Sequence, residues 1–117
     1  MDAWLHIEGD VMYGLYDYRA TLFAFDVRKK RIVAQRRELG VGEHCWNALW
    51  PGPDGRIWGL TRTCVFAVPR DLSSVEVLAS YESPPGAGGY GVMGVALADD
   101  GCVYFPNDDH LMRLRIS

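Results

Sequence analysis

The sequence predicts an all-β fold built from a repeated unit. Its apolar runs are short, are rich in Val, Ile, Phe, Tyr and Trp, and are separated by Gly, Pro, Asp or Asn. This pattern is typical of strands joined by turns. No long segment shows the periodicity of an amphipathic helix. A phrase that begins with Asp-Gly also recurs along the chain, which points to a repeated strand unit.

The recurring phrase has three copies. The segment Asp54–Leu60 resembles Asp100–Pro106, and the two Asp residues are 46 positions apart. A more divergent copy spans Gly9–Leu15. Self-similarity with a period of about 40–50 residues is typical of repeat architectures. A second, shorter phrase follows each copy and comprises Leu22–Phe25, Val65–Val68 and Leu111–Leu114.

The strands can be assigned in chain order from the apolar runs and the turns that bound them. Asp-Gly between two apolar runs predicts a hairpin, because both residues tolerate the positive φ that tight turns require. The strands expected in the first copy are Ala3–Ile7, Val11–Tyr16, Thr21–Asp26 and Arg31–Leu39. Those in the second are Cys45–Trp50, Arg56–Leu60, Cys64–Val68 and Val75–Ser80. The third copy supplies Val92–Ala98, Cys102–Phe105 and Leu111–Ile116, without a fourth strand.

Four antiparallel strands in about 45 residues resemble one blade of a β-propeller. The turn and aromatic of Asp54–Trp58 and the strand ending Phe23–Asp26 resemble blades of streptogramin-lyase-like, gluconolactonase-like and quinoprotein-like propellers. The resemblance implies about 2.75 blades, at about 1–40, 41–83 and 84–117, the last without its outer strand. Three aromatics at equivalent positions are then expected to pack one blade against the next. They are Tyr13, Trp58 and Tyr104.

The blades are too few to close a ring. Propellers have roughly four to eight blades, so the partial propeller implied by the resemblance leaves blade faces uncovered and a strand edge unpaired. Exposed edges invite pairing with another chain. The expected partners are therefore a second copy of the chain or further blades.

The composition of the chain narrows the classes of function that it can have. The net charge of −3 gives no general attraction to nucleic acid or anionic membranes. No apolar run reaches the roughly 18 residues of a membrane span, and no secretory signal is visible, so we expect a cytoplasmic protein. The basic residues 28–31, 36 and 37 are interpreted as protection of an outer strand against edge pairing. Three cysteines without a C-x-x-C pair predict neither a disulfide framework nor structural zinc, and they are expected to be buried.

Strand direction divides the loops between two rims. The links between the second and third strands of a blade lie on one rim with the links between blades, and the Asp-Gly turns lie on the other. Function concentrates on loops held by a rigid scaffold, and the first rim carries most of the polar candidates. The candidate ligand-binding residues are Glu43, His44, Asn47, Arg62, Asp108, Asp109 and His110.

These residue types suit two kinds of chemistry. Carboxylates and imidazole can hold a divalent metal or act as acid and base, with Glu43 and Asp108 as candidate ligands of Ca²⁺ or Mg²⁺. Asn and Asp are also common in solvated turns, and this explanation is favoured, so no cofactor is expected. Resemblance to streptogramin lyases implies a catalytic His and acid, but Gly59-Leu60-Thr61 follows Trp58 where an aromatic and an acid belong. Resemblance to gluconolactonases implies bound calcium, for which only Glu43 and Asn47 match.

The leading hypothesis is a non-catalytic propeller repeat module that binds a protein or a small ligand through the first rim. One alternative is a fragment of a metal-dependent propeller enzyme, a lyase or a lactonase. Another is a repeat whose exposed blade faces serve assembly only. A metal site predicts that divalent ions raise the melting temperature, and that Glu43→Ala or Asp108→Ala abolishes the rise.

Overall fold

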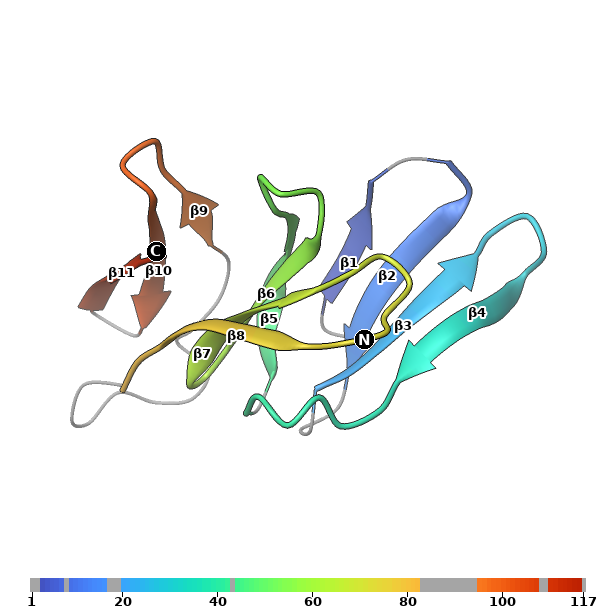
Figure 1. Cartoon of the computed structure of the whole chain (residues 1–117), viewed down its shortest axis with the longest axis horizontal. Helices are drawn as coiled ribbons and strands as arrows, with labels where there is room; N and C mark the ends of the chain where they lie inside the picture. The colour runs from blue at the N-terminus through green and yellow to red at the C-terminus, as the bar shows by residue number, and fades with distance from the viewer. Residues whose placement is uncertain are drawn as a thin grey trace.

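The described part of the chain folds into three antiparallel sheets. The computed structural model of the chain describes residues 3–7, 9–16, 20–42, 44–82, 95–107 and 110–116. Within these ranges all regular secondary structure consists of β-strands, which confirms the predicted all-β class. The sheets stand in a row in chain order (Figure 1), in a molecule of 45 × 29 × 20 Å. The described ranges contain no helix long and apolar enough to span a membrane.

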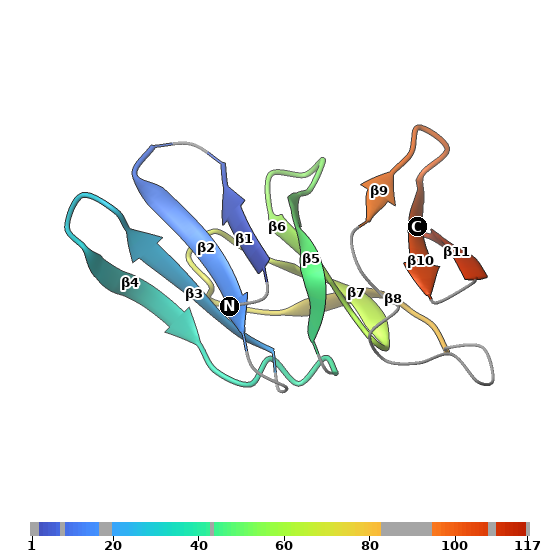
Figure 2. The ribbon, with the colours of Figure 1, turned by 180° about the vertical axis from the view of Figure 1, so that it is seen from behind.

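Each sheet is a meander of consecutive strands. The N-terminal sheet comprises β1 (Ala3–His6), β2 (Val11–Tyr16), β3 (Thr21–Asp26) and β4 (Arg31–Arg36), in that order. The central sheet comprises β5 (His44–Pro51), β6 (Ile57–Thr61), β7 (Cys64–Val68) and β8 (Glu76–Ser80). The C-terminal sheet comprises β9 (Ala96–Leu97), β10 (Cys102–Asn107) and β11 (His110–Arg115). Figure 2 shows the same row from behind, with β1 beside β5.

The predicted strands and the observed strands differ mainly at their ends. The bounds of β2, β3 and β7 agree with the prediction. The fourth strand was expected to reach Leu39 but ends at Arg36. There the chain leaves the sheet, because the Leu39 N–H donates to the Ala20 carbonyl (3.1 Å) and the Leu39 side chain is buried. The strand expected over Val92–Ala98 is described only at Ala96–Leu97, since residues 83–94 lie outside the described ranges.

The repeated phrase folds into the same turn in the central and C-terminal sheets. Gly55 and Gly101 have φ of 85° and 79°, a conformation that favours glycine. Asp54 accepts the N–H of the residue two positions on at 3.0 Å, and Asp100 does so at 2.9 Å. Each carboxylate also accepts an aromatic donor, the Trp58 indole at 3.0 Å and the Tyr104 hydroxyl at 2.6 Å. The phrase is therefore a structural unit that ties each turn to its strand.

The central sheet is buried on both faces. Every residue of β6 and β7 is buried, and side chains alternate between the two faces of a strand. On one face, Ile57, Phe66 and Val68 pack in a cluster with residues of the N-terminal sheet. On the other face, Trp58, Leu60, Val65 and Ala67 pack in a cluster with Val103 and Phe105.

The aromatics expected to pack between neighbouring units follow this arrangement. Tyr13 is buried between the N-terminal and central sheets, and Trp58 between the central and C-terminal sheets, as predicted. Tyr104 is half-buried, on the face of the C-terminal sheet directed away from the central sheet. Cys64 and Cys102 are buried free thiols, as expected, and the side chain of Cys45 lies outside the description.

Candidate functional site

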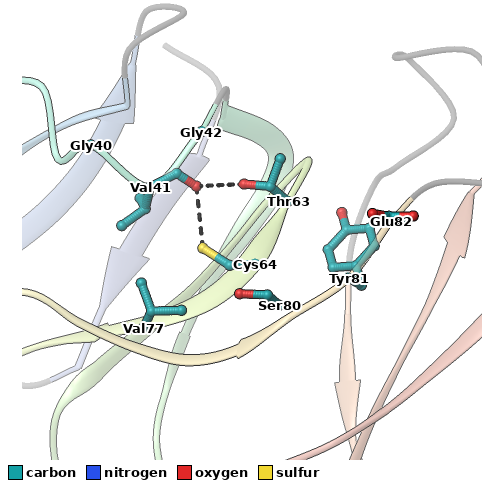
Figure 3. A pocket seen from close by; sticks show the side chains of 9 residues that line it. All are labelled: Gly40, Val41, Gly42, Thr63, Cys64, Val77, Ser80, Tyr81 and Glu82. Carbon is teal, nitrogen blue, oxygen red and sulfur yellow. Dashed lines mark hydrogen bonds between the residues drawn. The ribbon is translucent and has the colours of Figure 1, made fainter.

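A groove of about 760 Å³ opens on the rim that the sequence predicts to hold a site (Figure 3). One wall combines the β4–β5 link, at Gly40–Gly42, with the β6–β7 turn, at Thr63 and Cys64. The other wall is Val77 and Ser80–Glu82, from β8 and the residues after it. These links lie along the lower edge of Figure 1, whereas the Asp-Gly turns lie along its upper edge.

The carbonyl of Val41 fixes the first wall. Its oxygen accepts hydrogen bonds from the hydroxyls of Thr61 (2.6 Å) and Thr63 (2.9 Å) and from the thiol of Cys64 (3.2 Å). The Thr61 hydroxyl in turn accepts the N–H of Cys64 at 3.2 Å. The β4–β5 link is thereby held against the β6–β7 turn, and the wall is formed before any ligand arrives.

Gly42 lets these two segments approach. A Cβ at this position would collide with the Thr63 hydroxyl, and its φ of 99° disfavours other residues. The close approach at the groove therefore depends on glycine, and we expect any larger residue here to displace the wall.

Tyr81 fixes the second wall. Its N–H donates to the Thr63 carbonyl at 2.9 Å, and its hydroxyl donates to the Thr61 carbonyl at 2.5 Å. Its ring also packs on Phe105 of the C-terminal sheet, with 4.9 Å between ring centroids. Beside it, Ser80 and Glu82 are exposed and offer a hydroxyl and a carboxylate to solvent. Both walls are therefore preorganised around a polar and acidic opening.

The groove combines polar and apolar groups. Burial raises the pKa of the Cys64 thiol, against smaller opposing effects of Thr61 and Thr63, so the thiol stays protonated at neutral pH and acts as a donor to Val41. Among the described residues no group of three or more His, Cys, Asp or Glu side chains is placed to hold a metal. The groove offers hydrogen-bonding groups, one carboxylate and apolar contact at Val77.

Two predicted site residues come together at this rim. His44 begins β5 and pairs with Thr61, so its backbone lies next to that of Arg62 in the β6–β7 turn. Asn47 lies further along β5. His110 is exposed and pairs with Asn107, on the C-terminal sheet. Glu43, Asp108 and Asp109 fall outside the described residues, as do the side chains of His44 and Asn47.

None of the residues that line the groove was among the candidate residues chosen from the sequence. The Gly40-Val41-Gly42 link and the hydroxyl-rich segment Thr61–Cys64 are visible in the sequence, but neither pattern shows that the two segments meet. A second hollow, of about 390 Å³, lies on the opposite rim, which the sequence predicts to carry mainly turn residues. It is lined by Pro53, Trp58, Leu97, Ala98, Asp99, Gly101 and Ile116.

Searches against protein-family models, curated proteins and solved structures found no match for the chain.

Proposed function

We propose that the chain is a non-catalytic, propeller-type repeat module that binds a short extended segment of a partner protein in the rim groove. The observation that carries this proposal is the groove itself, whose two walls are fixed by hydrogen bonds within the chain. A preformed site binds with a smaller loss of conformational entropy than one that must order on binding.

The propeller-type assignment is supported by the repetition within the chain. Three consecutive meanders stand in a row, two of them with the same Asp-Gly turn. The central meander buries both faces against its neighbours. Stacked four-stranded blades have this arrangement.

An extended peptide suits the groove because of the strand beside it. β8 is the last strand in the order of the central sheet, and its residues Val77 and Ser80 line the groove. The edge of a sheet presents backbone groups that an extended peptide can pair with, while neighbouring pockets select its side chains. The exposed carboxylate of Glu82 favours a peptide with a basic residue.

The test uses peptides selected from a phage-displayed library of random heptapeptides. Their affinity is measured by calorimetry for the wild-type chain and for Ser80→Trp, which fills the groove. Ser74→Trp is the matched control, because Ser74 is an exposed serine in the β7–β8 turn, outside the groove lining. We expect Ser80→Trp to weaken binding by at least about tenfold, or ~1.4 kcal/mol, and Ser74→Trp to leave it unchanged.

Two results would overturn the proposal. Selected peptides that bind Ser80→Trp as tightly as wild type would place binding elsewhere, for example in the hollow on the opposite rim. A rise in melting temperature with Ca²⁺ or Mg²⁺ that is abolished by Glu43→Ala or Asp108→Ala would instead favour the metal-dependent enzyme.

A further inference from the structure

The N-terminal sheet has an uncovered apolar face. Tyr13, Leu15 and Leu22 point toward the central sheet, so the alternate residues of β2 and β3 point away from it. On that outer face, Met12 pairs with Phe25, and Phe25 pairs with Ile32. Ile32 is 51% exposed. The N-terminal face is defined here by Met12, Tyr16, Phe25 and Ile32, which are partly or largely exposed. Phe23 lies on the same side but is only 6% exposed.

The central sheet shows what the same positions do when they are covered. In the repeat, Val68 corresponds to Phe25. Val68 is fully buried, in the cluster shared with the preceding sheet, whereas Phe25 is half-buried. The N-terminal face thus carries side chains of the kind that contact a preceding sheet, but no described residue of the chain supplies one.

The C-terminal sheet has the complementary uncovered face. Val65 and Ala67 of β7 contact the following sheet, and Leu111 and Arg113 correspond to them in the repeat. Both are exposed, Leu111 by 75%. The C-terminal face is defined here by Tyr104, Leu111, Arg113 and Arg115, which lie on the side of β10 and β11 directed away from the central sheet.

We propose that a second copy of this chain covers both faces, with the C-terminal face of each copy stacked on the N-terminal face of the other. The chain already makes this contact twice, between its first and second sheets and between its second and third. Repeating it between copies closes a ring by two-fold rotation. Two copies supply six sheets, within the roughly four to eight blades of known propellers, whereas three copies exceed that range.

Charge complementarity supports the same contact. Within the chain, the β7–β8 turn reaches back onto the preceding sheet, where the Tyr13 hydroxyl donates to the Arg70 carbonyl at 3.1 Å. The corresponding turn of the N-terminal sheet joins β3 to β4 and carries three exposed cations, Arg28, Lys29 and Lys30. It would reach the neighbourhood of Tyr104 in the second copy, where the β9–β10 turn carries the exposed carboxylates Asp99 and Asp100, the second of which also pairs with Arg113 of its own chain at 3.7 Å. Opposite charges at these places favour the head-to-tail orientation.

The test is the mass of the 117-residue chain by sedimentation velocity in the micromolar range. We expect about twice the 13.1 kDa of one chain. Ile32→Arg and Leu111→Arg each place a charge in the contact, and each is expected to give a monomer. Ser74→Arg is the matched control, because Ser74 is exposed in the β7–β8 turn of the central sheet and belongs neither to the two faces nor to the groove lining. It is expected to leave the dimer intact.

A mixing experiment tests the head-to-tail orientation. Ile32→Arg keeps an intact C-terminal face and Leu111→Arg an intact N-terminal face, so a mixture regains one of the two contacts. We expect a mixed dimer under conditions where neither variant associates alone. Dimerisation of Leu111→Arg with loss in Ile32→Arg would mean that N-terminal faces pair with each other, and a monomeric wild type would mean that no second copy binds. Either result would overturn the proposal.

Discussion

The central and N-terminal sheets place equivalent residues in opposite environments. Val68 of the central sheet is fully buried, while the equivalent Phe25 of the N-terminal sheet is only partly covered. Val65 and Leu22 are both buried, because each faces a following sheet that is present. The position of a residue in its strand thus determines the face to which its side chain points, and the neighbouring sheet determines how much of that side chain is buried.

This difference predicts where stability resides. Removing apolar surface from water contributes about 1.5–3 kcal/mol for a fully buried large side chain. The central sheet is stabilised by apolar burial on both faces, and the N-terminal sheet mainly on one. Substitutions at equivalent positions should therefore be most damaging in the central sheet.

The largest expected effect is that of Phe66→Ala. Truncating a buried Phe costs about 3–5 kcal/mol, which is a large part of the stability of a domain of this size. Phe25→Ala, at the position equivalent to the buried Val68, should cost less, since its side chain is already partly in water. Urea unfolding in the Leu111→Arg background keeps the chains monomeric, so the two variants can be compared. Equal losses would mean that the central sheet is no better covered than the N-terminal sheet.

Gly59→Ala tests how tightly the central sheet is packed. Gly59 pairs with Phe66, and a Cβ at Gly59 would run into the Phe66 ring. Because the ring is enclosed, overpacking should cost about 1–3 kcal/mol of unfolding free energy. Loss of the penalty when Gly59→Ala is combined with Phe66→Leu would confirm the collision. A neutral single variant would contradict it.

The repeated turn predicts equal effects in two different sheets. Gly55→Ala and Gly101→Ala each place a Cβ at positive φ without a steric contact, and each should cost about 1 kcal/mol. The two values are measured by thermal unfolding and should agree within error. A much larger loss at one position would show that the two turns are not equivalent.

The smallest expected effect is a loss of stability in acid. Hydrogen bonds from Tyr104 and the Cys102 N–H lower the pKa of Asp100. Burial raises the pKa of Asp54. Hydrogen bonds from the side chain and backbone N–H of Arg56 and from the Trp58 indole outweigh this effect, so the pKa of Asp54 is lowered overall. Because the folded pKa lies below the unfolded value of about 3.9, this stabilisation is present above that pH and is lost as pH falls through the folded pKa.

Asp54→Asn and Asp100→Asn should therefore lower the melting temperature at neutral pH and flatten its fall below about pH 4. Melting curves taken along a pH series check this. A fall as steep as that of the wild type would assign the acid sensitivity to other carboxylates. Asp26→Asn extends the test outside the repeated phrase: the pKa of Asp26 is lowered mainly by the Lys29 N–H, so this variant should also flatten the fall.

The local features of the fold could be predicted from the sequence. Apolar runs and Asp-Gly turns located the strands, because hairpin geometry depends on neighbouring residues. The end of β4 could not be predicted, since it depends on a hydrogen bond between Leu39 and Ala20. The propeller assignment and ring closure remain predictions.

The candidate site was predictable only in its location. Its walls depend on contacts between residues about 20 positions apart, such as Val41 with Thr61 and Tyr81 with Thr61. No local pattern reports these contacts. Of the seven candidate residues, the structure pairs the backbone of His44 with Thr61, the residue that precedes Arg62 at the rim. The roles of Glu43, Asp108 and Asp109 remain predictions.

Native-state hydrogen exchange at two protein concentrations tests the central claim most directly. At low concentration, the amides of β6 and β7 should exchange most slowly and those of β10 and β11 faster, because only the central sheet is covered on both faces. At high concentration, the protection of β10 and β11 should rise toward that of the central sheet. Equal protection of all three sheets at low concentration, unchanged on concentration, would contradict the account.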